Sequence, residues 1–277
     1  MWHLKVDKTL HVYWGGGALP YMRYLTVKSF MDLNPGWEVN LWMSSEKCNK
    51  VTWRSGENDY RTVCDDYFPQ LLKLPVIRKV IDFKKFGFVK ESAEVHKADY
   101  IRIAALKYYG GVWSDMDIIY FRPIEDIYVN DLRNRDKEVF VCVGPYGHST
   151  GFLMAQEESQ MFNLLSDNIS RCFNPLSYQC LGPDIFNRYF RDIKKIPSSV
   201  NLSMDVVYSH DANNQKDLLN LNEGRFTDKS IGCHWYGGHP MWSDFIKKTN
   251  GGLKNLPDNI IGNLINGQLR NTSKSIV

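Results

Sequence analysis

Apolar runs of strand length alternate with longer segments of helical periodicity along the chain. Residues 10–14 predict a short strand, and residues 20–33 predict a helix that begins after three glycines. Residues 92–109 carry apolar side chains at helical spacing, with Ser92 as the expected N-cap and a glycine pair at 110–111 as the stop. Residues 139–144 predict another buried strand. This alternation is typical of an α/β fold.

Two carboxylates, Asp115 and Asp117, lie one residue apart between apolar runs. The pattern predicts a short acidic turn at the edge of a buried sheet, with both carboxylates on one side and Met116 facing the core. Paired carboxylates beside a diphosphate are a usual site for Mg²⁺ or Mn²⁺, which take oxygen ligands. Taken alone, however, the pair is more typical of a surface turn that favours Asp.

The helix predicted before this turn carries Asp99 and Arg102 on one face, because they are three residues apart. In isolation such a pair is most simply an ion pair within a helix. A helix that runs into Gly-Gly and then into a strand with Asp-x-Asp is a more specific arrangement.

This order of residues resembles the DXD-containing glycosyltransferases with the A-type (GT-A) fold, in the branch related to yeast initiating mannosyltransferases, capsular sugar transferases and clostridial glucosylating toxins. The resemblance covers chiefly the first 155 residues. Residues 10–16 are similar to the family's first strand and nucleotide-binding turn, and residues 35–42 to its second strand. The central pattern comprises Asp99, Arg102, Leu106, Gly110, Gly111, Trp113, Asp115, Met116 and Asp117.

The resemblance implies a Rossmann-like sheet that binds a nucleotide-sugar, with helices on both faces and a smaller acceptor-side lobe. We expect a single domain over residues 1–277, with a basic inserted lobe at 46–90 and a loosely ordered tail at 250–277.

Trp14, followed by Gly15 and Gly16, is the expected donor-binding turn. Ligands of open α/β sheets bind beyond the carboxyl ends of the strands, which places Trp14 at the rim of a cleft. Position alone is equally compatible with a core aromatic. The resemblance favours stacking on the nucleotide base.

The resemblance also assigns roles to the charged residues of the central pattern. Asp117 would hold a divalent ion, and Asp115 would hold the ribose or a metal-bound water. Asp99 and Arg102 would orient the sugar hydroxyls. These four residues are the catalytic candidates.

Later segments supply candidates for the metal and the acceptor. His234, in a segment similar to a late family motif, is a candidate metal ligand or a donor to the departing phosphate, and His239 is a weaker candidate. His148 is more typical of a loop histidine. The acceptor-side candidates are Ser149, Thr150, Gly151, Gly182 and Asp184.

These features, with the retention of anomeric configuration that the resemblance implies, predict a metal-dependent hexosyl- or pentosyltransferase. We expect a UDP-sugar as the nucleotide-sugar donor and a saccharide hydroxyl as acceptor. One alternative is transfer to a hydroxymethylated base in DNA, as in bacteriophages. Others are a catalytically inactive sugar-nucleotide-binding protein and a phosphatase of the haloacid dehalogenase type, in which Asp-x-Asp usually lies near the amino end.

Composition narrows these alternatives only slightly. The 277 residues carry a net charge of +3, which is too small to indicate a dedicated nucleic-acid-binding protein. Basic side chains that could follow a phosphate backbone are Arg78, Lys79, Lys84, Lys85 and Lys90.

The cysteines show no Cys-x-x-Cys pair or disulfide framework, so we expect free thiols in a reducing compartment. No signal peptide or membrane span is apparent, and a cytoplasmic protein is expected. The cysteines are Cys48, Cys64, Cys142, Cys172, Cys180 and Cys233.

Overall fold

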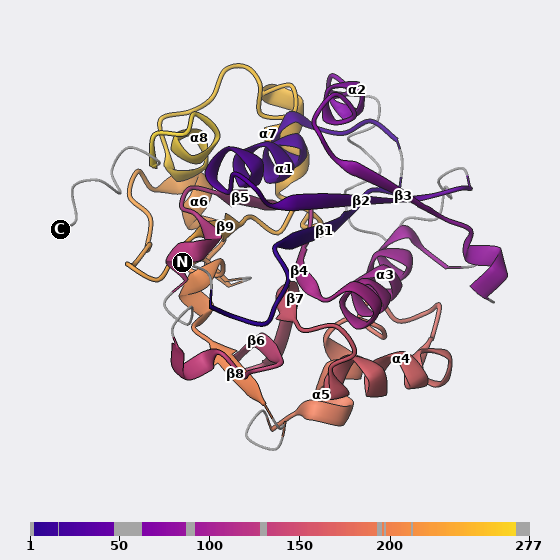
Figure 1. Ribbon diagram of the computed structural model, residues 1–277. Helices are drawn as coiled ribbons and strands as arrows, with labels where there is room; N and C mark the ends of the chain where they lie inside the picture. The colour runs from indigo at the N-terminus through magenta and orange to yellow at the C-terminus, as the bar shows by residue number, and fades with distance from the viewer. Residues whose placement is uncertain are drawn as a thin grey trace.

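The computed structural model describes most of the chain, as residues 3–15, 17–46, 63–86, 92–127, 132–192, 196, 198–211 and 213–269 (Figure 1). Three residues singled out from the sequence, Gly16, Cys48 and Lys90, lie outside this range. The other five cysteines are free thiols, as expected.

A mixed seven-stranded sheet forms the centre of the molecule, with strands in the order β3-β2-β1-β4-β7-β6-β8. Strands β3, β2, β1 and β4 are parallel, whereas β7 runs antiparallel to both β4 and β6. The strands are β1 (Thr9–Tyr13), β2 (Glu38–Ser44), β3 (Ile77–Ile81), β4 (Gly111–Ser114), β6 (Val139–Gly144), β7 (Gly147–Ala155) and β8 (Ser199–Leu202). A smaller sheet pairs β5 (Ile118–Tyr120) with β9 (Gly232–His234).

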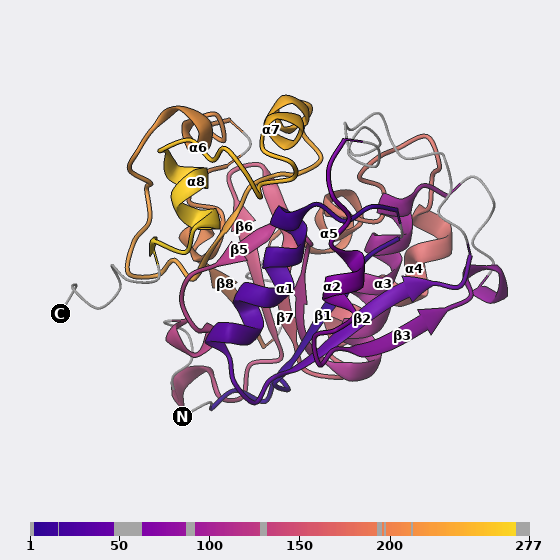
Figure 2. The same cartoon turned by 90° about the horizontal axis from the view of Figure 1, so that it is seen from above.

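Helices cover both faces of the large sheet (Figure 1), in agreement with the predicted α/β class. Helices α3, α4 and α5 lie on one face, and α1 lies on the other. Figure 2 shows α6, α7 and α8 gathered beside the β5–β9 sheet. The helices are α1 (Tyr21–Leu33), α2 (Phe68–Leu71), α3 (Glu94–Tyr109), α4 (Gln160–Cys172), α5 (Pro183–Phe190), α6 (Asp217–Asn220), α7 (Trp242–Lys248) and α8 (Ile260–Ile265).

The apolar side chains form a separate cluster on each side of the sheet. Leu10 and Val12 of β1 pack towards α1, whereas Tyr13 packs towards the face covered by α3. Since successive side chains of a strand point to opposite faces, a strand buried on both sides reads as a continuous apolar run. This explains why the apolar run at residues 10–14 predicted strand β1.

Helix α3 begins two residues later than the sequence suggested. Its N-cap is Ala93 rather than Ser92, so that prediction was wrong. The Ala93 N–H donates to His96 Nδ1 at 3.2 Å, but the alanine side chain cannot accept from the N–H groups of the first turn, as a serine hydroxyl would.

Two further regions differ from the expectations. Part of the stretch at 46–90, expected to be a basic inserted lobe, is β3, the edge strand of the central sheet. Part of the expected loose tail is α8, whose Ile260 and Ile261 are buried against α1 and α7 side chains. Among the described residues, no helix is long and apolar enough to cross a membrane.

Candidate active site

The Asp-x-Asp segment forms a tight turn between β4 and β5, at the carboxyl end of β4. Met116 is buried in the core at the centre of this turn, where the sequence placed it. Asp115 N–H donates to Gly151 O at 2.7 Å, and Trp235 N–H donates to Asp117 O at 2.9 Å. The turn is therefore fixed from both sides by backbone bonds to β7 and to the segment after β9.

Arg102 connects α3 with this turn. Its Nη1 donates to Asp99 Oδ1 at 2.5 Å and to Thr150 Oγ1 at 3.0 Å, while Nη2 donates to Asp115 Oδ1 at 2.8 Å. Trp113 Nε1 donates to the same Asp115 oxygen at 2.7 Å. Asp115 thus has Oδ1 held by two donors, so its orientation is set before any ligand binds.

Burial alters the proton affinities of this network. Burial raises the pKa of Asp99 to about 7, although the Arg102 charge opposes the shift. Burial alone would lower the pKa of Arg102, but the carboxylates of Asp115 and Asp99 raise it above its ordinary value. Arg102 therefore remains a cation, and Asp99 titrates near neutral pH.

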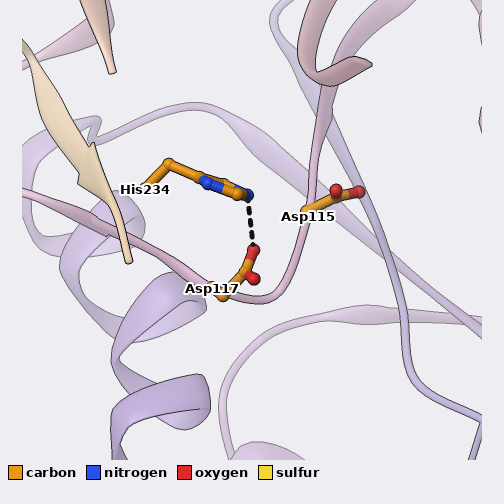
Figure 3. A group of neighbouring side chains, drawn as sticks. All are labelled: Asp115, Asp117 and His234. Atoms are coloured by element: carbon orange, nitrogen blue, oxygen red, sulfur yellow. Dashed lines mark ion pairs between the residues drawn. The ribbon is translucent and has the colours of Figure 1, made fainter. Parts of the chain in front are cut away.

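Asp115, Asp117 and His234 offer ligand atoms that all lie within 4.8 Å of one another. Asp117 Oδ1 lies 3.0 Å from His234 Nε2, and Figure 3 shows this ion pair joining the turn to β9. Burial tends to raise the pKa of Asp117, but the imidazole, the Arg23 charge and the Gly237 N–H hold it below its usual range. Asp117 is therefore ionised at neutral pH.

The space beside these three residues is kept open by a glycine. A Cβ at Gly151 would lie 3.0 Å from Asp115 Oδ2, 3.1 Å from His234 Nε2 and 3.1 Å from Tyr208 Oη. Two carboxylates and an imidazole are a donor set suited to Mn²⁺, and carboxylates alone suit Mg²⁺. The residues present therefore fit a divalent ion.

A cavity of about 140 Å³, called here the Trp14 cavity, lies directly beside this cluster. Trp14 and Gly15 form part of its wall, together with Asp99, Asp115 and Asp117. The structure thus brings the first glycine turn and the central pattern to one site. Trp14 is only partly buried, as a side chain at a rim should be.

Arg23 of α1 also lines the Trp14 cavity, and the sequence analysis missed it. Its guanidinium lies over the Trp14 and Trp235 rings, at 5.6 Å and 5.4 Å from their centroids. The side chain is only 5% exposed, and a Cβ at Gly237 would lie 2.7 Å from its Nη2. No local sequence signal marks it, because α1 is buried on several sides and its buried positions include polar side chains.

Glu94 was also missed. Its Oε2 accepts a hydrogen bond from Tyr13 Oη at 2.7 Å, and its Oε1 pairs with the buried Lys97 at 2.9 Å. A Cβ at Gly15 would overlap this carboxylate, lying 1.8 Å from Oε2. The Glu94 carboxylate occupies the space that a side chain at residue 15 would need, which explains the glycine at this position.

A second cavity of about 670 Å³, called here the Tyr146 cavity, opens on the other side of Asp99, Arg102 and Asp115. The acceptor-side candidates Ser149, Thr150, Gly151 and Asp184 line it, as does His234. Gly182 lies behind this wall, where a Cβ would come 3.2 Å from Asp99 Oδ2.

Two other histidines have structural partners. His148 is buried, and its Nε2 lies 2.7 Å from Phe190 O, so it joins β7 to α5. Burial lowers its pKa, which keeps the ring neutral. His239 is exposed, and its Nδ1 accepts from Met241 N–H at 3.2 Å, next to α7.

The comparisons with known proteins agree with this geometry. Residues 22–136 match the family model described as "Glycosyltransferase sugar-binding region containing DXD motif". This region, less than half of the chain, resembles the DXD glycosyltransferases. It contains β2, α3 and the whole acidic turn, and a comparison with curated protein sequences gave no match.

A solved glycosyltransferase structure shares the fold. The galactosyltransferase LgtC, in complex with donor and acceptor sugar analogs, superposes with a TM-score of 0.51 over 90% of this chain and 98% of that chain, at 13% identity. Lower scores are found for GlyE of Streptococcus pneumoniae TIGR4 (TM-score 0.45, 14% identity, 83% and 55% covered) and for the PaToxG glycosyltransferase (0.44, 16%, 68% and 71%). The likeness to LgtC shows that the chain has the GT-A fold.

Proposed function

We propose that the protein is a metal-dependent, retaining glycosyltransferase that moves a sugar from a UDP-sugar to a saccharide hydroxyl. The observation that carries this proposal is the convergence of Asp115, Asp117 and His234 at the junction of the two cavities. One cavity has an aromatic rim suited to a base, and the other is large enough for a sugar acceptor.

In the transfer, the acceptor oxygen forms a bond to C1 of the donor sugar as the bond from C1 to the phosphate oxygen breaks. The nucleoside diphosphate leaves with the electron pair, and the hydroxyl proton passes to the departing phosphate or to solvent. Positive charge builds on the sugar ring during this step, as in glycoside hydrolysis. The carboxylates of Asp99 and Asp115, fixed by Arg102, would stabilise this charge and orient the sugar hydroxyls.

Asp115, Asp117 and His234 would hold the divalent ion, which when bound would neutralise charge on the leaving diphosphate. Arg23 supplies a positive charge in the Trp14 cavity in addition to the charge of the ion. Because the guanidinium lies between two aromatic rings, it is already oriented for an anionic group.

The arrangement of Asp115 does not favour a phosphatase of the haloacid dehalogenase type. In such an enzyme the first Asp of the pair is the nucleophile. Here its Oδ1 accepts from both Arg102 and Trp113, which suits a positioning role rather than attack.

The donor can be identified by nucleotide release. The purified protein would be incubated with UDP-glucose, UDP-galactose, UDP-N-acetylglucosamine, UDP-xylose and GDP-mannose, each with Mn²⁺ and with a mixture of glycosides. We expect release from a UDP-sugar that is faster with the glycosides than without them. Release from none of the donors would contradict the proposal, and release from GDP-mannose alone would contradict the UDP assignment.

A further inference from the structure

The walls of the Tyr146 cavity carry an excess of negative charge. Among the described residues, the charged groups lining it are the carboxylates of Asp99, Asp115, Asp184 and Asp211 and one cation, Arg102, besides the imidazoles of His148 and His234. Arg102 is already paired with Asp99 and Asp115. Away from the metal-site candidates, these residues therefore offer a bound anion no unpaired basic side chain.

The other two carboxylates come from separate elements. Asp184 lies in the first turn of α5 and is exposed, and Asp211 follows η6 (Met204–Val206) and is half-buried. Within the described part of the chain, neither forms an ion pair. Asp211 Oδ1 accepts from Asn213 N–H at 2.8 Å, so its orientation is fixed by its own turn. Both carboxylates can therefore repel an anion or accept hydrogen bonds from hydroxyl and ammonium groups.

An exposed aromatic side chain stands at the edge of the same cavity. Tyr146 is 87% exposed at the tip of the β6–β7 hairpin. The hairpin is held against α5, since His148 N–H donates to Asn187 Oδ1 at 3.0 Å. Gly147 has φ +114°, and a Cβ there would lie 2.4 Å from the same amide oxygen. Tyr146 is thus exposed on an anchored turn.

We propose that the Tyr146 cavity binds an uncharged or amino-bearing saccharide, which stacks a ring face on Tyr146 and donates hydrogen bonds to Asp184 and Asp211. Acidic saccharides and nucleic acids are excluded by charge. This inference rests on the proposed glycosyltransferase function. It concerns only which acceptor the site takes.

Four of the basic side chains that could follow a phosphate backbone do not offset this charge, and the fifth, Lys90, lies outside the described residues. Arg78 and Lys79 belong to β3, the edge strand at the opposite end of the sheet from β6 and β8. Lys84 pairs with Glu46 at 3.8 Å, and Lys85 pairs with Asp82 at 3.9 Å. None of these four residues lines the Tyr146 cavity.

The charge preference is tested with matched acceptors. The 4-nitrophenyl glycosides of glucose, glucosamine and glucuronic acid, and the corresponding galactose series, differ mainly in charge. Acceptor kcat/KM would be obtained from nucleotide release above the acceptor-free rate. We expect the neutral or amino glycoside to exceed its uronide at least tenfold in one series.

Two substitutions test whether the carboxylates cause this preference. The double variant Asp184→Asn with Asp211→Asn should raise the uronide's relative kcat/KM about fivefold, since each charge at roughly 8 Å in water changes binding about two- to threefold. Asp244→Asn is the matched control, because Asp244 also lies exposed in a helical first turn but lines neither cavity. It should leave the ratio unchanged.

The role of Tyr146 is tested by Tyr146→Ala and Tyr146→Phe. The Ala variant should raise acceptor KM at least fivefold with little change in kcat, and the Phe variant should retain the wild-type KM. The matched control is Tyr108→Ala, since Tyr108 is 53% exposed on α3 and lines neither cavity.

The outcomes separate this inference from the function on which it rests. If wild-type protein releases no nucleotide from any donor, the proposed function fails. If no glycoside accelerates release, transfer to a saccharide fails with it. If glycosides accelerate release but uronides are preferred, or the double variant leaves the charge preference unchanged, the acceptor inference is overturned while the function stands. An unchanged acceptor KM in Tyr146→Ala would overturn the proposed stacking of the saccharide on Tyr146.

Discussion

Arg102 and Asp115 are joined by a 2.8 Å ion pair that links helix α3 to the acidic turn. The side chain of Arg102 is almost fully buried, and its second carboxylate partner is Asp99. A planar guanidinium can bridge two carboxylates in fixed directions, which an ammonium group cannot. The pair therefore sets the position of the turn as well as its charge.

Substitutions of Arg102 should distinguish its contribution to protein stability from its role in positioning the acidic turn. Arg102→Ala leaves the buried Asp99 and the partly exposed Asp115 without their cation and should lower the free energy of unfolding by about 3–5 kcal/mol. Arg102→Lys keeps the charge but loses the bridge, so turnover should fall at least 100-fold with a smaller loss of stability. Urea unfolding and nucleotide release measure the two effects. Equal activity of Arg102→Lys and wild type would refute the positioning role.

Trp14 should contribute to binding of the donor base. Trp14→Ala should weaken UDP binding by about 1–3 kcal/mol, the range for stacking between a base and an aromatic side chain. Trp14→Phe should retain most of the affinity. Isothermal titration calorimetry with UDP measures both variants. An unchanged affinity in Trp14→Ala would indicate that Trp14 only packs against the core.

Donor affinity should depend on pH through Asp99. Burial raises the pKa of Asp99 to about 7, so the carboxylate is ionised above this pH and protonated below it. A protonated Asp99 accepts sugar hydroxyls less well, and affinity for the UDP-sugar should therefore rise as pH increases from 6 to 8. Titrations of wild type and Asp99→Asn provide the comparison. A pH dependence that persists in the Asn variant would assign it to another group.

Gly151 should be essential at the site but not for folding. A methyl group there would lie within 3.0–3.1 Å of Asp115, His234 and Tyr208, so Gly151→Ala should remove most of the activity. Gly144→Ala is the control, because its Cβ would lie 3.4 Å from the flexible Met204 side chain. Thermal unfolding should show Gly151→Ala to be folded. Wild-type turnover in that variant would mean that the space beside Gly151 is not used.

The sequence predicted the local elements of the fold better than their contacts. Helical periodicity located α1 and α3, and a continuous apolar run located β6, which is buried on both faces. The sequence did not predict β3, since an edge strand with alternate exposed residues carries charged side chains and no long apolar run. It also misplaced the N-cap of α3, which is an alanine without a side-chain acceptor.

The candidate site was predictable where its residues are close in sequence. Asp99, Arg102 and Asp115 lie within one helix and the turn after it, and the family resemblance added His234. Arg23 was not found, because only the tertiary fold brings α1 beside the turn. Gly151 leaves room beside the side chains of Asp115, His234 and Tyr208. This role could not be predicted either, because residues distant in sequence form these contacts.

Removing the metal most directly tests the central claim that Asp115 and Asp117 support metal-dependent sugar transfer. Nucleotide release from the preferred UDP-sugar would be measured for wild type, Asp115→Asn and Asp117→Asn, each with Mn²⁺ and with excess EDTA. We expect EDTA to abolish wild-type release, Mn²⁺ to restore it, and both folded variants to lose at least 100-fold in turnover. Full release in excess EDTA, or wild-type turnover in either Asn variant, would contradict it.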